Sequence, residues 1–256
     1  MTILRYTVGT IMGALSVAVL FLLTRINTSW IFLVVWFVWF AGQGLFGWYL
    51  GKKLSGEPRE LPLILFNTVA VTILLVILED NLWRYGLIGL TGLMMGWLFV
   101  QAGRRVSGLG YEERPYRRVR MMLWVFAAYA ILTLVYALNS FFPIMPFWPI
   151  SLIGSAVVAM VSLLIWRMYF AVSWQSLFLW ATAIGLVVWE IIWVQHFLPF
   201  GYLVLGALTA WIWYVIQLLV RFHLGQHDIV WRKQIYFLAT NLILYILMLW
   251  VFVRWI

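Results

Sequence analysis

The stretch WIFLVVWFVWFAGQGLFGWYL covers Trp30–Leu50 and contains no charged side chain. A helix rises about 1.5 Å per residue, so this stretch forms a helix of about 30 Å, the thickness of a bilayer's hydrocarbon core. A half-buried strand would show apolar and polar residues in alternation, and this stretch does not. It therefore predicts a membrane-spanning helix.

Similar apolar runs, separated by short polar breaks, recur along the whole chain. Of the 256 residues, 66% are hydrophobic and 10% are charged, which is more apolar surface than a soluble domain of this length buries. The predicted fold class is all-α, a polytopic transmembrane helical bundle of about nine spans in a single integral membrane domain. The spans cover Arg5–Thr24, Trp30–Leu50, Leu61–Leu78, Trp83–Ala102, Val119–Ser140, Pro149–Phe170, Trp174–Gln195, Pro199–Arg221 and Gln234–Trp255.

The longest polar stretch, GRRVSGLGYEERPYRR, covers residues 103–118. Its glycines and its proline break helices, and its charges are dense, so it is predicted to be a basic loop. It separates the first four spans, in residues 1–102, from the last five, in residues 119–256.

The basic residues of the connecting segments are distributed unequally. Of the 17 Lys and Arg, 14 fall on one side of the predicted membrane. Positive loops stay in the cytoplasm, so the N-terminus is predicted to be cytoplasmic and the C-terminus external. The net charge of +9 is thus explained by topology, and nucleic acid is not expected as a partner.

The outer connections have a common pattern that suggests repeated helical hairpins. In EDNLWRYGLIGL and EIIWVQHFLPFGYLVLG, a carboxylate (Glu79 or Glu190) precedes an aromatic–glycine pair and a returning helix. A third connection, NSFFPIMPFWPI, carries Asn139 near the position of the acid. The alternative is that any tight hairpin at a membrane surface favours glycine, proline and aromatic residues.

Six residues form a candidate functional polar cluster. Glu79, Asp80 and Arg84 follow the third span, where a proton or cation site, or a catalytic carboxylate, competes with a simple capped turn at the headgroups. The other members are Glu190, His196 and Asn241. Glu190 is flanked by tryptophans about one turn inside the seventh span. Burial of the Glu190 carboxylate without a partner would be unfavourable.

Two further groups of residues are candidates for binding. His223 and His227 are four residues apart and Asp228 follows, which is a weak metal-ligand pattern. Gly89, Gly92 and Gly96 form one smooth face of the fourth span, typical of close helix contact within a chain or between chains. No cofactor is predicted, and the absence of cysteine excludes a thiolate nucleophile or a cysteine metal site.

The segment EDNLWRYG, residues 79–86, resembles the EExxxRG signature of the CAAX-processing and bacteriocin-processing intramembrane proteases. His196 in WVQHF resembles the histidine of their second motif, with Trp193 at its aromatic position. Asn241 matches the asparagine of their third motif, HxxxN. The resemblance implies a membrane-embedded metalloprotease in which carboxylates and a histidine activate water.

The chain departs from that signature at three positions. Asp80 replaces the second glutamate, Tyr85 intervenes before the glycine, and Phe237 stands in place of the histidine of HxxxN. These departures imply a degenerate relative of the proteases, with one metal ligand missing.

Three functions are therefore compatible with the sequence. The favoured one is a non-enzymatic scaffold or subunit, with no catalytic residues, which contacts membrane lipids and other membrane proteins through small-residue helix faces. The second is a small-molecule or ion carrier with an outer acidic site, and the third is the protease-like hydrolase. The expected location is the cytoplasmic membrane of a prokaryote.

Overall fold

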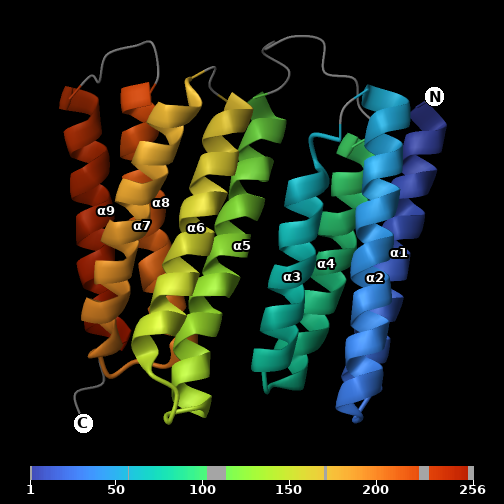
Figure 1. The fold of residues 1–256 in the computed structure, drawn as a ribbon, viewed down its shortest axis with the longest axis horizontal. Coiled ribbons are helices and arrows are strands. Elements are labelled where there is room, and N and C mark those ends of the chain that lie inside the picture. Colours follow the sequence, from blue (N-terminus) through green and yellow to red (C-terminus); the bar gives the residue numbers. More distant parts are fainter. Residues whose placement is uncertain (1, 57, 103–113, 170–171, 225–230, 253–256) are drawn as a thin grey trace. The chain divides into compact units, whose positions relative to one another are not determined.

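The computed structural model describes residues 2–56, 58–102, 114–169, 172–224 and 231–252. Within these ranges the chain is helical and contains no strand (Figure 1). The elements are α1 (Thr2–Arg25), α2 (Ser29–Leu50), the π-helical turn η1 (Gly51–Ser55), α3 (Leu61–Ile77), α4 (Asn81–Ala102), α5 (Arg114–Phe141), α6 (Phe147–Tyr169), α7 (Trp174–His196), α8 (Tyr202–Leu224) and α9 (Trp231–Phe252).

The helices coincide with the predicted spans to within a few residues at most ends. The largest difference is at α5, which begins at Arg114, so the last five residues of the predicted loop 103–118 are helical. The remainder of that loop, residues 103–113, lies outside the described residues.

Seven of the described helices are long and apolar enough to cross a membrane. The other two apolar segments, α3 and Ile235–Val251 within α9, are shorter than 18 residues. A helix of 17 residues is about 26 Å long, slightly less than the thickness of a typical hydrocarbon core. The helical class is confirmed, whereas the count of nine spans stays a prediction.

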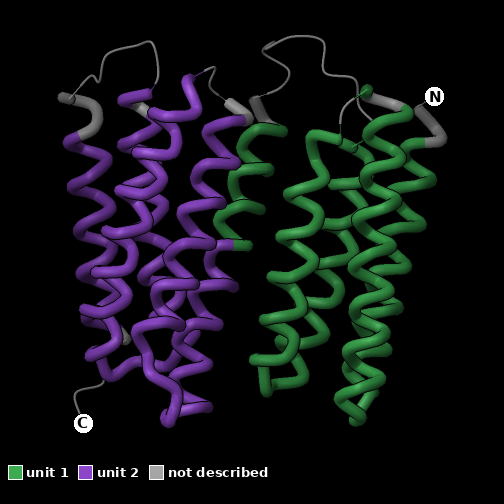
Figure 2. Tube along the Cα trace, viewed as in Figure 1, with its two compact units in different colours: residues 1–127 green, residues 128–256 purple. Residues whose placement is uncertain are grey.

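The chain forms two compact units, residues 1–127 (unit 1) and residues 128–256 (unit 2), shown in Figure 2. The division falls within α5, so the first half of this helix belongs with α1–α4. The sequence placed the division at residues 103–118, and so assigned all of the fifth span to the second part.

In unit 1, glycines bring α1 and α4 into close contact. A Cβ atom at Gly9 would lie 2.6 Å from the carbonyl oxygen of Gly96, and one at Gly13 would lie 2.5 Å from that of Gly92. Real side-chain carbons do not approach a carbonyl so closely, so only glycine fits at these positions. Two GxxxG pairs therefore face each other, which is the usual way for membrane helices to pack without a hydrophobic driving force.

Polar side chains join the other helices of unit 1. Trp36 Nε1 on α2 donates to Thr72 Oγ1 on α3 at 2.9 Å, and Gln43 Nε2 donates to Ser16 Oγ on α1 at 3.2 Å. After α2, the π-helical turn η1 ends at Ser55 and is followed by Gly56, whose φ of +89° favours glycine. This turn reverses the chain toward α3.

In unit 2, a close approach between α5 and α8 organises the packing. A Cβ atom at Gly206 would lie 2.8 Å from the backbone nitrogen of Thr133. Trp213 Nε1 on α8 donates to Ser162 Oγ on α6 at 2.9 Å, and Trp189 Nε1 on α7 donates to Ser151 Oγ at 3.0 Å. Buried hydroxyls thus receive the indole N–H groups that apolar packing alone would leave unpaired.

Candidate functional site

Unit 2 contains a neutral hydrogen-bond network made of Tyr136, Gln195, Thr209 and Tyr245. The Tyr136 hydroxyl lies 2.8 Å from Thr209 Oγ1, which lies 2.5 Å from Gln195 Oε1, and Gln195 Nε2 donates to the Tyr245 hydroxyl at 2.8 Å. When Thr209 donates its one proton to Gln195, Tyr136 donates to Thr209. The network connects α5, α8, α7 and α9 without a charged group.

His196 lies beside this network at the end of α7. Its ring is stacked on Phe147, with 4.2 Å between centroids, and its Nδ1 lies 3.5 Å from Nδ2 of Asn139. Trp193 packs edge-on against the same Phe147 ring. Two of the connections that the sequence predicts to be on the outer side thus meet at His196 and Asn139.

The helix that carries His196 is continuous from Trp174. Glu190 therefore projects from a different face, and it is exposed. Its carboxylate has no hydrogen bond or ion pair within the part of the chain that the structure describes. The buried face of α7 contains Leu177, Ala181, Ile184, Val188, Ile192 and Gln195.

Asn241, the sixth member of the candidate cluster, is used in packing. Its Oδ1 accepts from Trp211 Nε1 at 3.0 Å, and its Nδ2 donates to the carbonyl oxygen of Phe237 at 2.8 Å. The amide thereby attaches α9 to α8. Phe237, at the position of the HxxxN histidine, supplies only its backbone carbonyl to this arrangement.

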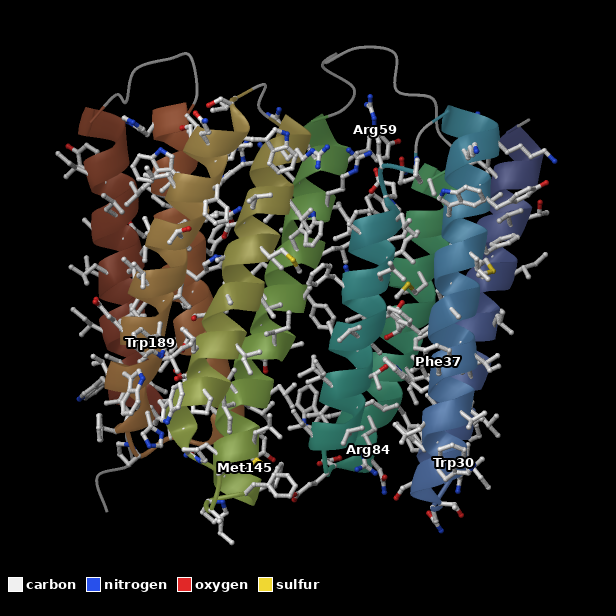
Figure 3. The ribbon with its side chains drawn as sticks, in the orientation of Figure 1. Trp30, Phe37, Arg59, Arg84, Met145 and Trp189 are labelled. Carbon is white, nitrogen blue, oxygen red and sulfur yellow. The ribbon has the colours of Figure 1, made fainter. Side chains whose placement is uncertain are left out.

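Glu79, Asp80 and Arg84 form a turn at the end of unit 1 (Figure 3 labels Arg84). Both acids are exposed, and Asp80 Oδ1 accepts from the backbone N–H of Leu82 at 2.7 Å. Arg84 Nε donates to the carbonyl oxygen of Leu78. Asp80 therefore caps the start of α4, and the arginine closes the turn through a backbone carbonyl.

The residues suggested for metal binding are only partly described. His223 is exposed and its ring lies 5.2 Å from that of Trp180, while His227 and Asp228 lie outside the described residues. Among the residues that are described, no group of three or more His, Asp or Glu side chains is placed to hold a metal ion.

The glycine face of α4 is divided between two environments. Gly92 and Gly96 contact Gly13 and Gly9 of α1, so this part of the face is occupied within the chain. A Cβ atom at Gly89 would meet nothing within 4 Å. Gly89 therefore lies outside the close contact.

A buried ion pair in unit 1 was missed by the sequence reasoning. Arg120 Nη2 on α5 lies 2.6 Å from Glu60 Oε1, just before α3, and Glu60 is only 4% exposed. Burial raises the pKa of the Glu60 carboxyl above its ordinary value, and the positive charges of Arg120 and Arg59 oppose that rise. The only sequence signal was an acid directly before an apolar helix, in a connection that also carries Lys52, Lys53 and Arg59.

The ion pair leaves some of its polar atoms without partners. Glu60 Oε2 and Arg120 Nε are buried and make no hydrogen bond with the described residues. The cost of removing the Glu60 carboxylate from water is therefore only partly offset by the contact between its Oε1 and Arg120. This agrees with the raised pKa of Glu60.

Gln217 on α8 is a second buried polar group with unsatisfied atoms. It is 1% exposed, and neither Nε2 nor Oε1 has a partner in the described part of the chain. The indole N–H of Trp166 on α6 is also buried and unpaired there. Each of these residues lies four positions after a member of the Trp213–Ser162 hydrogen bond, so they lie about one helical turn beyond it.

Comparison with known proteins adds no relative, because no protein-family model, curated protein or solved structure matches the chain. The class of protein is defined by the fold. Seven described helices are long and apolar enough to cross a bilayer, and large hydrophobic side chains such as Phe37 and Leu93 are exposed on helix surfaces. The chain thus fits a multi-pass membrane protein.

Proposed function

We propose that the chain is a non-enzymatic structural subunit of the membrane, which acts by presenting helix surfaces to lipids and to other membrane proteins. The observation that carries this proposal comes from unit 2, where the buried polar contacts between helices are made by uncharged side chains and the acidic Glu190 lies outside them. The network of Tyr136, Gln195, Thr209 and Tyr245 is neutral and buried at its first three members, while Glu190 is exposed. A carrier for ions needs titratable or coordinating groups that face its interior.

The charge distribution supports an orientation for this subunit. In unit 1, Arg59 lies at one end, and Arg84 and Trp30 lie at the opposite end (Figure 3). Lys52 and Lys53 fall in η1, next to the connection that carries Arg59. We propose that this basic end faces the cytoplasm of a prokaryotic cell, with the N-terminus inside.

A small-molecule or ion carrier is the second candidate, and Gln217 is the observation that favours it. A buried amide with no partner is costly, so such groups call for an explanation. In a carrier, the amide would contact the transported molecule. In a structural subunit, it is a local defect in the packing.

The substitution Gln217→Leu separates these two functions. For a structural subunit we expect the free energy of unfolding to rise by about 1–3 kcal/mol, since an unpaired buried amide is replaced by an apolar group of similar size. In proteoliposomes, fluorescent dyes should report no more proton or cation flux than in empty vesicles. The proposal fails if the wild-type chain conducts and Gln217→Leu abolishes that flux.

A further inference from the structure

We propose that the exposed face of α7 around Glu190 docks a membrane-spanning helix of another protein, and that this helix carries a lysine or arginine at the depth of Glu190. The inference rests on the proposed function as a structural subunit and names its partner.

The rotation of α7 about its axis is determined by contacts on its inner face. Gln195 bonds to Thr209 and Tyr245, and Trp189 bonds to Ser151. Val188 and Ile192 are both fully buried, and each is two residues from Glu190. Two residues correspond to about 200° around a helix, so Glu190 points away from the packed side.

The neighbours of Glu190 on this outer face are exposed and mostly apolar. Along the spacing of three and four residues, they are Phe178, Thr182, Leu186, Val194 and Phe197. Thr182 gives its hydroxyl proton to the carbonyl oxygen of Phe178 at 2.9 Å. Glu190 is therefore the one ionisable group on a stripe that otherwise suits lipid or a second helix.

The depth of Glu190 makes lipid alone a poor environment. It lies six residues before His196, the last residue of α7, which corresponds to about 9 Å along the axis. A glutamate side chain is shorter than the lysine and arginine chains that extend from such positions to the headgroups. An ionised carboxylate at this depth is stabilised by a basic residue of a facing helix, and the flanking apolar stripe supplies the packing surface.

The negative charge of Glu190 also disfavours a second copy of this chain as the docking partner. Two copies related by a two-fold axis through this face would bring two Glu190 carboxylates together. Like charges repel, so a partner with the opposite charge is favoured.

The test uses a synthetic leucine–alanine helix of about 20 residues as the probe, with one lysine six residues from its outer end. A matched probe has leucine at that position. The chain has no cysteine, so Met145→Cys, at an exposed position of unit 2 away from α7, provides a single site for a fluorescent label. Energy transfer in phospholipid vesicles then measures association with each probe.

We expect the lysine probe to associate about tenfold more tightly than the leucine probe, which corresponds to one well-formed polar contact in a membrane. Glu190→Gln should reduce the association of the lysine probe to that of the leucine probe. Glu79→Gln, which changes an exposed acid in unit 1, should leave the association of both probes unchanged.

Equal association of both probes with the wild-type chain, or a preference for the lysine probe that survives Glu190→Gln, would overturn the proposal. Energy transfer between wild-type copies of the chain as strong as the transfer to the lysine probe would also overturn it, in favour of self-association. The proton and cation flux of the wild-type chain is measured in vesicles that contain no probe. Failure of docking is therefore distinguishable from failure of the structural role.

Discussion

Glu60→Ala is expected to lower the free energy of unfolding by about 3–5 kcal/mol, the usual cost of leaving one partner of a buried ion pair uncompensated. Glu60 is 4% exposed, and its carboxylate lies 2.6 Å from the Arg120 guanidinium. Removal of the carboxylate leaves the positive charge of Arg120 without its partner in a low-dielectric site. The measurement is reversible unfolding in lipid bicelles. Glu79→Ala, which removes an exposed acid, should change the stability by less than about 0.5 kcal/mol.

The pKa of Glu60 also predicts how the stability of the chain depends on pH. Because burial raises that pKa, the folded chain retains the carboxyl proton over a pH range in which the unfolded chain has lost it. The stability of the wild-type chain relative to Glu60→Gln should therefore decline as the pH rises from 4.5, the ordinary value, through the higher folded value. The double variant Glu60→Met, Arg120→Met should be about as stable as the wild type, since it removes both charges. If Glu60→Ala is as stable as Glu79→Ala, the pair does not hold α3 to α5.

Gly13→Leu is the second substitution with a large expected effect. A Cβ atom at this position would lie 2.5 Å from the carbonyl oxygen of Gly92 and 3.3 Å from the Cα atom of Gly96, both of which are backbone atoms. The helices must separate to admit a side chain, so we expect a loss of about 3 kcal/mol, at the upper end of the cost of overpacking. Unfolding in bicelles again measures it.

Gly89→Leu is the matched control for that experiment. Gly89 lies on α4 one turn from Gly92, and nothing lies within 4 Å of an added Cβ atom. The control should therefore be neutral or slightly stabilising, because glycine weakens a helix. A Gly13→Leu variant as stable as this control would show that α1 and α4 do not pack through their glycines.

The positions of the helices were predictable because long apolar runs determine them directly. The ends of the helices were less predictable where charged residues form part of a helix. Arg114 and the arginines after it had the composition of a loop, yet they form the first turns of α5. Local composition cannot distinguish a solvated helix end from a loop, since both favour charged residues.

The contacts between helices were largely beyond the sequence. Gly92 and Gly96 were recognisable as a smooth face, but only the folded chain shows that Gly9 and Gly13 cover it and that Gly89 is left out. Thr209 and Gln195 are ordinary neutral residues on different helices, and nothing in their spacing indicates a shared hydrogen bond. Such pairs depend on how each helix is rotated, which follows from the packing of the whole unit.

The most direct test of the account is the side of the membrane that each connection faces. Single cysteines are introduced by Lys53→Cys, Asn81→Cys, Met145→Cys and Gln175→Cys, all at exposed positions of a chain that has no cysteine of its own. Intact cells are then treated with a membrane-impermeant maleimide. We predict that the cysteines at positions 81 and 145 react in intact cells, and that those at 53 and 175 react only after lysis. Labelling of position 53 or 175 in intact cells, or protection of 81 and 145, would contradict the proposed architecture.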